Sequence, residues 1–469
     1  MKNIYSLALL TLLSGACTVS KPIKVSQPEL PGAFRGIAIQ GDSSSIADLP
    51  WRSFFTDAVL QQLIDSAVVK NYDMQIAIKN IESSRLSLDQ VKWNYLPQAN
   101  LQVSGNRNRP SDNSLTGLSL TQYNLNTKHI DDYSAAPVLS WEADIWGKIK
   151  NQQQVELSSY LQSGQAKNAI QTMLVASVSQ GYYALLMLDE QLDIAHKNVR
   201  LSDSTLHMIK LQYDAGQVTS LAVEQSASQV LTAAQLVPAF EQEISIRENA
   251  LKILTGELPG SIHRDTRLDE VKVPAILTAG IPAALVGRRP DVNIRQLALM
   301  AANAKVGISK AEMYPALRIT ASGGVNSFKA SNWFNIPASL FGIIGGSIAQ
   351  PVFQQRRLHT QYAIAKVERE IAVLQFRQVV LTAVGEVTDA LVKIEKLKAQ
   401  QGILSQRVAV LQKATSNANQ LFKSGMANYL EVITAQSNVL QSELELATVK
   451  QAELSAVAEL YRSLGGGWK

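Results

Sequence analysis

The chain has 469 residues, of which 46% are hydrophobic and only 18% are charged, and its formal net charge is +5. This length can hold several domains, and lysine and arginine are scattered rather than gathered in a patch, which argues against nucleic-acid binding. The five histidines show no metal-ligand spacing, and the sequence contains no GxSxG, P-loop or GxGxxG motif. It offers no catalytic site, and we expect neither an enzyme nor a cofactor nor a metal site.

The first sixteen residues have the features of a secretory signal peptide. Lys2 gives a positive start, residues 4–13 form an apolar run, and residues 14–16 are small. The apolar run is too short to span a bilayer, so we expect residues 1–16 to be removed.

Cys17, the only cysteine, follows this segment directly and cannot form an internal disulfide. We expect a bacterial lipoprotein signal, with cleavage before Cys17 and acylation of its thiol and new amine. Each acyl chain would contribute about 0.8 kcal/mol per buried CH₂ to anchoring. Leu13 lies four residues before the cysteine rather than the usual three, so ordinary cleavage that leaves an incidental thiol is the alternative. Thr18 stands where an aspartate would favour the inner membrane, which indicates the outer membrane.

Four segments have the alternation of half-buried β-strands. In the first, Ala99, Leu101, Val103 and Gly105 alternate with polar residues. Strands of about 9–11 residues with one apolar face suit a lipid-facing barrel, although a soluble hairpin packed on helices has the same pattern. The expected strands are residues 98–107, 133–142, 316–326 and 340–350, and the aromatic residues expected near their ends are Tyr123, Tyr133, Trp141, Trp333, Phe334 and Phe341.

Long tracts without proline follow each pair of strands, and they can hold long helices because proline costs about 3 kcal/mol in a helix interior. No proline lies between Pro137 and Pro238, and none lies in residues 352–469. Apolar residues recur there at heptad spacing, which predicts helices packed lengthwise. A soluble antiparallel coiled-coil rod would show the same spacing. The clearest seam comprises Val380, Val384, Val387, Leu391 and Ile394.

One short joint occurs twice, as Ala215-Gly216 and Ser424-Gly425, and the offset between the glycines is 425 − 216 = 209 residues. Each half of the chain runs helix, strand, loop, strand, long helix, turn and long helix with the joint near its middle, so the whole half is repeated. Four strands cannot close a membrane barrel, because the smallest barrels have about eight. Open strand edges are not tolerated in lipid, so several chains must pool their strands.

The expected organisation of the chain follows from these patterns. Its parts are a signal peptide (1–16), a lipid-anchored extended segment (17–56), a first repeat (57–260), an inter-repeat linker (261–281), a second repeat (282–460) and a C-terminal tail (461–469).

At several places the chain resembles the TolC-like outer-membrane efflux factors, in the lipidated branch that works with resistance-nodulation-division pumps. The resemblance covers essentially all of the chain after the signal peptide. It is carried by WRSFFTDAVLQQLIDSAVVKNYDMQIA (51–77), LSWEADIWGKIK (139–150), GRRPDVNIRQLALMAANAKVGISKAEMYPALRITASGG (287–324), AQPVFQQRR (349–357), YRSLGGGW (461–468) and the two joints.

The resemblance implies an α+β membrane protein that forms a homotrimer. Three chains would lend four strands each to one 12-stranded outer-membrane β-barrel, continued by a long periplasmic α-helical barrel with a mixed equatorial domain. The implied function is passive conduction of drugs or other toxic compounds, including metal ions, in a tripartite efflux system of a Gram-negative bacterium. An inner-membrane pump would supply the energy and a periplasmic adaptor would bridge the two. The remaining alternative is a lipid-anchored periplasmic coiled-coil scaffold without a pore.

In such channels the periplasmic ends close, and carboxylates there favour cations. We expect the paired helices to reverse near residues 188–193 and 387–395, and the joints at Gly216 and Gly425 to lie at the equatorial belt. The residues 288–291 (Arg-Arg-Pro-Asp) have the composition of a helix start and are interpreted as structural. The candidate gate residues are Asp189, Glu190, Asp193 and Asp389, with Glu386 and Glu395 as secondary candidates, and each has a solvated surface carboxylate or helix cap as its alternative.

Overall fold

The computed structural model describes residues 34, 45–122, 128–271 and 278–469. The signal peptide, Cys17 and Tyr123 lie outside these residues. The described chain divides into two compact units, one made of residues 83–161 and 297–374, the other of residues 45–82, 162–296 and 375–469. Two long helices, α6 (Lys148–Asp214) and α11 (Arg357–Lys423), contribute to both units.

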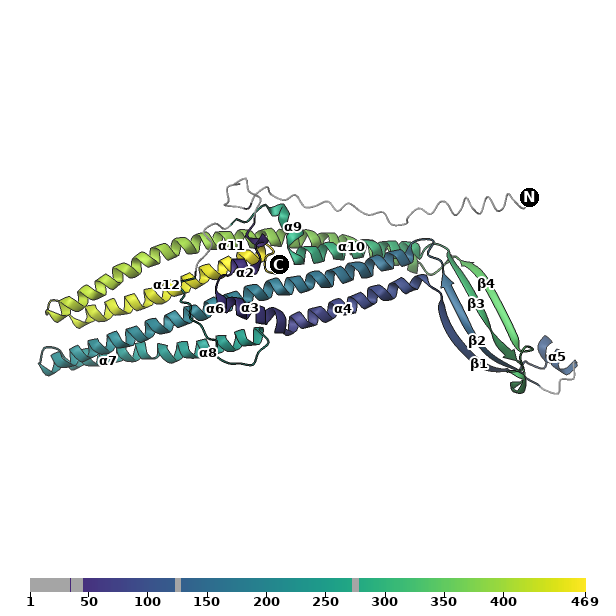
Figure 1. Cartoon of the computed structure of the whole chain (residues 1–469), viewed down its shortest axis with the longest axis horizontal. Coiled ribbons are helices and arrows are strands. Elements are labelled where there is room, and N and C mark those ends of the chain that lie inside the picture. The colour runs from purple at the N-terminus through teal and green to yellow at the C-terminus, as the bar shows by residue number, and fades with distance from the viewer. Residues whose placement is uncertain (1–33, 35–44, 123–127, 272–277) are drawn as a thin grey trace. The chain divides into compact units, whose positions relative to one another are not determined.

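The first unit contains a four-stranded antiparallel sheet in the order β1-β2-β3-β4 (Figure 1). The four predicted strands are confirmed, and β2 begins three residues earlier than expected. Their bounds are β1 (Gln98–Asn108), β2 (Ile130–Glu142), β3 (Ala316–Ser327) and β4 (Leu340–Ala349). The sheet is open, so β1 and β4 each have an edge that no other described strand of the chain pairs with.

The strand register places apolar side chains of all four strands on one face of the sheet. Leu101 lies opposite Pro137, Leu139 opposite Ala321, and Ala321 opposite Ile344. This apolar face is uncovered in the single chain, since Leu101 is 77% exposed and Ile344 85%. A face of this kind, unbroken across the sheet, is what a lipid-facing strand requires.

Aromatic residues lie near both ends of the strands. At one end Tyr133 and Trp333 have ring centroids 5.8 Å apart, and Phe334 lies beside Trp333. At the other end the indole N–H of Trp141 donates to the Tyr95 carbonyl over 2.8 Å. Residues 133 and 141 are eight apart, about 27 Å in an extended strand, which matches the apolar band of a membrane barrel.

Helices lead into and out of these strands. Two of them, α4 (Tyr72–Lys92) and α10 (Pro290–Ala311), precede β1 and β3, and the short α5 (Leu115–Gln122) lies between β1 and β2. Pro290 opens α10 and Asp291 lies in its first turn, which confirms the predicted helix start. The single-turn elements here are η2 (Trp93–Tyr95) and η4 (Ala330–Asn332).

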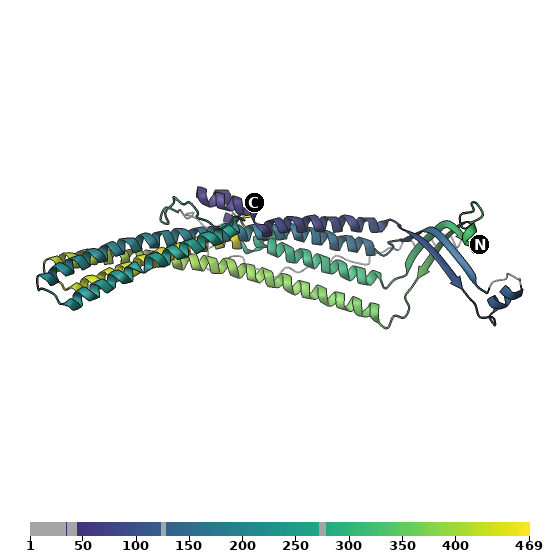
Figure 2. The same cartoon turned by 90° about the horizontal axis from the view of Figure 1, so that it is seen from below.

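The second unit is built around two helical hairpins. α6 is followed by α7 (Ser220–Ala234) and α8 (Leu236–Leu254), and α11 is followed by α12 (Tyr429–Ser463). The break between α7 and α8 at Gln235 has a simple cause, because Pro238 lacks the N–H that would bond the carbonyl four residues earlier. Both views place the α6–α7 turn and the α11–α12 turn at the same end (Figures 1 and 2).

Short elements and the C-terminal tail pack together in the second unit. Tyr461 stacks on Phe54 with ring centroids 4.2 Å apart, and its hydroxyl donates to the Leu49 carbonyl over 2.7 Å. Gly466 lies so close to the Tyr461 ring that a Cβ would come within 2.5 Å of it. The short elements are η1 (Ile46–Asp48), α2 (Trp51–Phe54), α3 (Ala58–Lys70), η3 (Pro282–Ala284) and α9 (Leu285–Arg288).

One helix among the described residues, α11, contains a window apolar enough to cross a membrane by length and composition, with a mean hydropathy of 1.3. The same helix carries the predicted heptad seam, and that seam is buried: Val380 is 1% exposed and Val387 0%. Helix packing therefore accounts for the seam, which is the smaller part of the apolar window, since 28% of that window is buried.

Candidate functional site

The two joints are the turns at which the long hairpins reverse. Gly216 and Gly425 both have φ = +73°, a conformation that glycine adopts without strain. The Gly216 N–H donates to the Tyr213 carbonyl, and the Gln217 N–H donates to the Gln212 carbonyl, each over 2.8 Å. The same pair of bonds ends α11, so both helices close with a Schellman motif.

The residues around both turns share one hydrophobic cluster. Its buried members are Ile209 and Ala222 from the first hairpin, and Phe422 and Val432 from the second. Partly buried neighbours complete it, namely Met208, Val218, Val223, Ala418, Ala427 and Tyr429. The two repeats therefore hold each other at their turns.

Two side-chain hydrogen bonds join the hairpins near this cluster. The Tyr429 hydroxyl donates to Gln225 Oε1 over 2.7 Å in an exposed position. Gln436 Nε2 donates to Thr205 Oγ1 over 2.8 Å, and Gln436 is fully buried. Buried polar atoms without a hydrogen-bond partner lie on the same two helices, at Asn198, Ser202 and Gln436, so this part of the α6–α12 contact is less well satisfied than an apolar seam.

The predicted positions of the helix reversals are wrong. α6 runs without interruption through residues 188–193, and α11 runs through residues 387–395. The chain reverses instead at Gly216 and Gly425, so the prediction that these joints lie at the equatorial belt is also wrong. The physical reason is that residues 188–193 and 387–395 contain neither glycine nor proline to stop a helix.

Three of the four gate candidates instead fix the inter-repeat linker to α6. Arg264 donates to both oxygens of Asp189 over 2.6 and 2.7 Å, and to Glu248 Oε1 over 2.5 Å. Burial alone would lower the pKa of Arg264, but the hydrogen bonds that it donates to these two carboxylates raise its pKa overall. Arg264 is 9% exposed at its side chain, so the guanidinium is shielded from water, whereas Asp189 is 39% exposed.

The neighbouring carboxylates have similar partners. Arg267 lies 3.5 Å from Glu190 and 4.0 Å from Asp193, and Asp193 also pairs with Lys197. The hydrogen bond from Lys197 lowers the pKa of Asp193. Asp189, Glu190 and Asp193 therefore lie within α6 beside ion-pair partners, and their role as gate residues stays a prediction.

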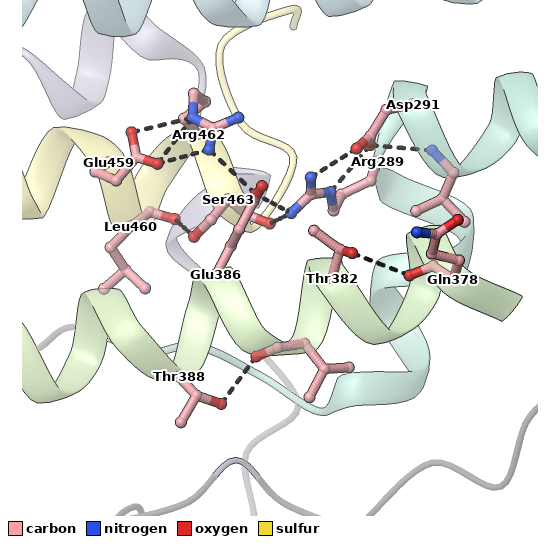
Figure 3. A network of polar contacts seen from close by, with 12 residues as sticks. Arg289, Asp291, Gln378, Thr382, Glu386, Thr388, Glu459, Leu460, Arg462 and Ser463 are labelled. Carbon is pink, nitrogen blue, oxygen red and sulfur yellow. Dashed lines mark hydrogen bonds and ion pairs between the residues drawn. The ribbon is translucent and has the colours of Figure 1, made fainter. Parts of the chain in front are cut away.

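The candidates on α11 lie along the helix and not at its end. Asp389 is exposed, and Glu395 pairs with its neighbour Lys396 over 2.6 Å at an exposed position. Glu386 belongs to a polar cluster with Arg289 and Arg462, drawn in Figure 3.

That cluster joins α10, α11 and the end of α12, and Arg289 is its buried centre at 4% exposed. Its guanidinium donates to both oxygens of Asp291 over 3.0 and 2.6 Å, to Glu386 over 2.8 Å and to the Ser463 carbonyl over 3.0 Å (Figure 3). Arg462 bonds the same Glu386 oxygen and Glu459. The sequence indicated the helix start at Arg289 but not its distant partners, because nothing in local periodicity reports a contact across about 97 residues.

No group of three or more His, Cys, Asp or Glu side chains in the described part of the chain could hold a metal ion.

Comparisons with known proteins agree with this architecture. The family model described as outer membrane efflux protein matches residues 63–257 and 281–466. The solvent efflux pump outer membrane protein SrpC of Pseudomonas putida is 30% identical, over 100% of this chain and 98% of its own length. The cation efflux system protein CusC of Escherichia coli is 28% identical, over 89% of this chain and 88% of its own length. The open state of the Neisseria gonorrhoeae MtrE outer membrane channel superposes with a TM-score of 0.85, at 23% identity, over 97% of this chain and 99% of that one.

Proposed function

Because this chain belongs to the outer membrane efflux protein family, we propose that it passively conducts drugs or other toxic compounds from an inner-membrane pump and a periplasmic adaptor to the exterior. The family makes it an outer-membrane channel and not an enzyme. Channels of this kind are homotrimers that work with adaptor and pump partners. The proposal adds that the pump belongs to the resistance-nodulation-division class.

The open sheet with one apolar face is the observation that carries this proposal. Its edge strands β1 and β4 have unpaired backbone groups, and a bilayer offers nothing to pair with them. Three copies of the sheet close into one barrel whose apolar face meets lipid and whose other face lines a water-filled lumen. A scaffold without a pore would have no use for an uncovered apolar face with aromatic residues at both ends.

A planar bilayer experiment tests the channel directly. The purified protein, extracted in detergent, is expected to insert and to give discrete conductance steps. A trimer band that survives mild SDS treatment is expected alongside. Release of the protein from membranes by salt, together with a flat current record, would favour the lipid-anchored coiled-coil scaffold.

We propose two alternative classes of cargo, organic solvents with antibiotics or metal cations, because the relatives named above differ in the compounds that their names give. SrpC is named for solvents and CusC for cations. A deletion strain should become sensitive to organic solvents and antibiotics in the first case and to metal salts in the second. Complementation with the intact gene is the control in both.

We also propose that Cys17 anchors the N-terminus to the outer membrane through acyl chains. A cysteine directly after a signal peptide, and the absence of any second cysteine to pair with it, support this assignment. Radiolabelled palmitate should enter the wild-type protein and not Cys17→Ser. Equal label in both would refute lipidation at this residue, without bearing on the channel.

We propose that the gate of the channel, the part that opens and closes, lies at the paired turns around Gly216 and Gly425. They combine exposed turns, one shared cluster and the exposed link from Tyr429 to Gln225. This location replaces the carboxylates of α6 and α11 as the expected gate region.

A further inference from the structure

The face of the sheet opposite the apolar one carries few charges. It holds mainly amides, hydroxyls and small residues, with Ile130, Val138, Phe341 and Ile343 as the large apolar exceptions. Within the four strands the charged residues on this face are Asp132, Glu142 and Arg318. Asp132 lies at one end of the sheet and accepts a hydrogen bond from Asn326 over 2.7 Å.

Glu142 and Arg318 lie opposite each other at the other end, where the strands meet the helices. Arg318 Nη2 lies 3.3 Å from Glu142 Oε2, and Lys148 Nζ lies 3.2 Å from Glu142 Oε1. One carboxylate is therefore shared by two cations. Both distances exceed the 2.7–2.9 Å of a strong charge-assisted bond, and the Arg318 side chain is 60% exposed, so its charge faces water.

These side chains line an open cavity of about 440 Å³. Three further charged groups line it: Asp144, Glu312 and Arg357. Both oxygens of Asp144 accept backbone N–H groups at the start of α6, each over 3.0 Å, so the helix N-terminus offsets about half of its charge. Glu312 and Arg357 have opposite signs. The six charges cancel formally, but the exposed side chains among them are Arg318 and Arg357, whereas Glu142, Asp144 and Glu312 are half-buried, so the charge that faces water is positive.

We propose that Arg318, with Lys148 and Glu142, forms a ring of positive charge in the lumen that favours anions and anionic cargo over cations. The proposal rests on the channel described above, since the apolar face must meet lipid for the opposite face to line the lumen. Three chains then contribute three copies of the cluster at one level of the pore. Rings of charged side chains set the sign of the ions that a pore prefers, and their influence reaches about 8 Å at physiological salt.

The test is the reversal potential of single channels in a KCl gradient, measured on four variants that form trimers. Arg318→Gln should shift the reversal potential toward cation selectivity, and Arg318→Lys should not. Glu142→Gln should shift it the opposite way, because it removes the compensating carboxylate. Arg107→Gln is the matched control: this arginine also pairs with a strand aspartate, Asp131, over 2.6 Å, but on the apolar face.

Liposome efflux of an anionic and a cationic dye gives a second readout. Arg318→Gln should slow the anionic dye relative to the cationic one. Unchanged reversal potentials in Arg318→Gln, or an equal shift in Arg107→Gln, would overturn the ring while leaving the channel intact. A wild-type protein that conducts nothing would instead contradict the proposed function itself.

Discussion

The hydroxyl of Tyr429 donates a 2.7 Å hydrogen bond to Oε1 of Gln225, which joins the first residue of α12 to α7. The two residues are 204 apart in the chain, and each lies one or two helical turns from a reversal. The bond is exposed, unlike the buried one between Gln436 and Thr205. The hydroxyl bond is thus open to water, while the Tyr429 ring packs against the hydrophobic cluster of the turns.

Replacing Tyr429 with phenylalanine should ease separation of the two turns. A hydrogen bond of this kind contributes about 0.5–1.5 kcal/mol, so the ratio of open to closed channels should rise by up to about tenfold. Single-channel recording measures this ratio as open probability. Tyr213→Phe is the control, since Tyr213 is also near a turn and 48% exposed. An equal effect in both variants would contradict a specific role for the Tyr429 bond.

Gly216 and Gly425 should resist substitution for conformational reasons alone. A Cβ at either position would meet no heavy atom within 4 Å, but φ = +73° costs a non-glycine residue roughly 1–2 kcal/mol. Gly216→Ala and Gly425→Ala should each lower the thermal unfolding midpoint of the detergent-extracted protein. Gly402→Ala, in the middle of α11 and also without close neighbours, should raise it, because alanine favours helix by about 1 kcal/mol. A lower unfolding midpoint in all three variants would indicate that steric contacts of the added methyl group, and not backbone strain at positive φ, cause the loss of stability.

The repeat predicted from the joints extends to every long helix. α11 begins and ends 209 residues after α6, since 357 − 148 = 209 and 423 − 214 = 209, and α12 stands in the same relation to the span of α7 and α8. The alternation of apolar and polar residues located the strands, and the tracts without proline located the long helices. Both signals are local: alternation reports which face of a strand is buried, and proline interrupts a helix because it lacks the backbone N–H.

Local sequence patterns could not predict where the long helices reverse or which distant residues pair with each other. A heptad seam looks the same whether the chain continues or turns back, so Leu188 and Val387 gave no sign that their helices run on. Gly216 and Gly425 were recognised as joints, and the Schellman signal in them would have located the turns. The pairing of Asp189 with Arg264 spans 75 residues, and only the tertiary structure reveals it.

Arg289 should be essential for the stability of the second unit. It is 4% exposed and bonded to Asp291 and Glu386, so Arg289→Met would leave Asp291 without its cation and Glu386 with Arg462 alone. Breaking a fully buried pair costs about 3–5 kcal/mol, and the cost here should lie below that range because the Asp291 and Glu386 side chains are 41% and 32% exposed. The measurement is the unfolding midpoint in detergent.

Arg52→Met is the control for Arg289→Met. Arg52 pairs with Asp65 at a surface site where its side chain is 59% exposed, and such pairs contribute about 0–1 kcal/mol. The two variants should therefore differ clearly. Similar midpoints would mean that the Arg289 cluster does not stabilise the fold.

Glu257 should make the junction of α3 and α8 sensitive to acid. Lys252 and Lys70 donate to its two oxygens over 2.8 and 2.6 Å, and these bonds lower the pKa of Glu257 to about 2. Glu257 can reach Lys70 because the preceding residue, Gly256, has φ = +70° and lies against the Lys70 carbonyl. A Cβ at Gly256 would come within 2.5 Å of that carbonyl. Since the folded pKa lies below the unfolded value of about 4.3, the ionised carboxylate stabilises the fold above that value. This contribution is lost as pH falls toward 2.

Glu257→Gln removes the charge and keeps the shape, so it should unfold at a lower temperature than wild type at neutral pH. The difference should stay constant down to about pH 5, shrink between about pH 4.3 and 2, and vanish below that, because the wild-type carboxylate is then protonated too. Glu243→Gln, which removes an exposed i,i+4 pair with Arg247, should show little difference at any pH. A Glu257→Gln deficit that persists unchanged at pH 2 would mean that the two lysines stabilise the junction through packing and not through the charge of Glu257.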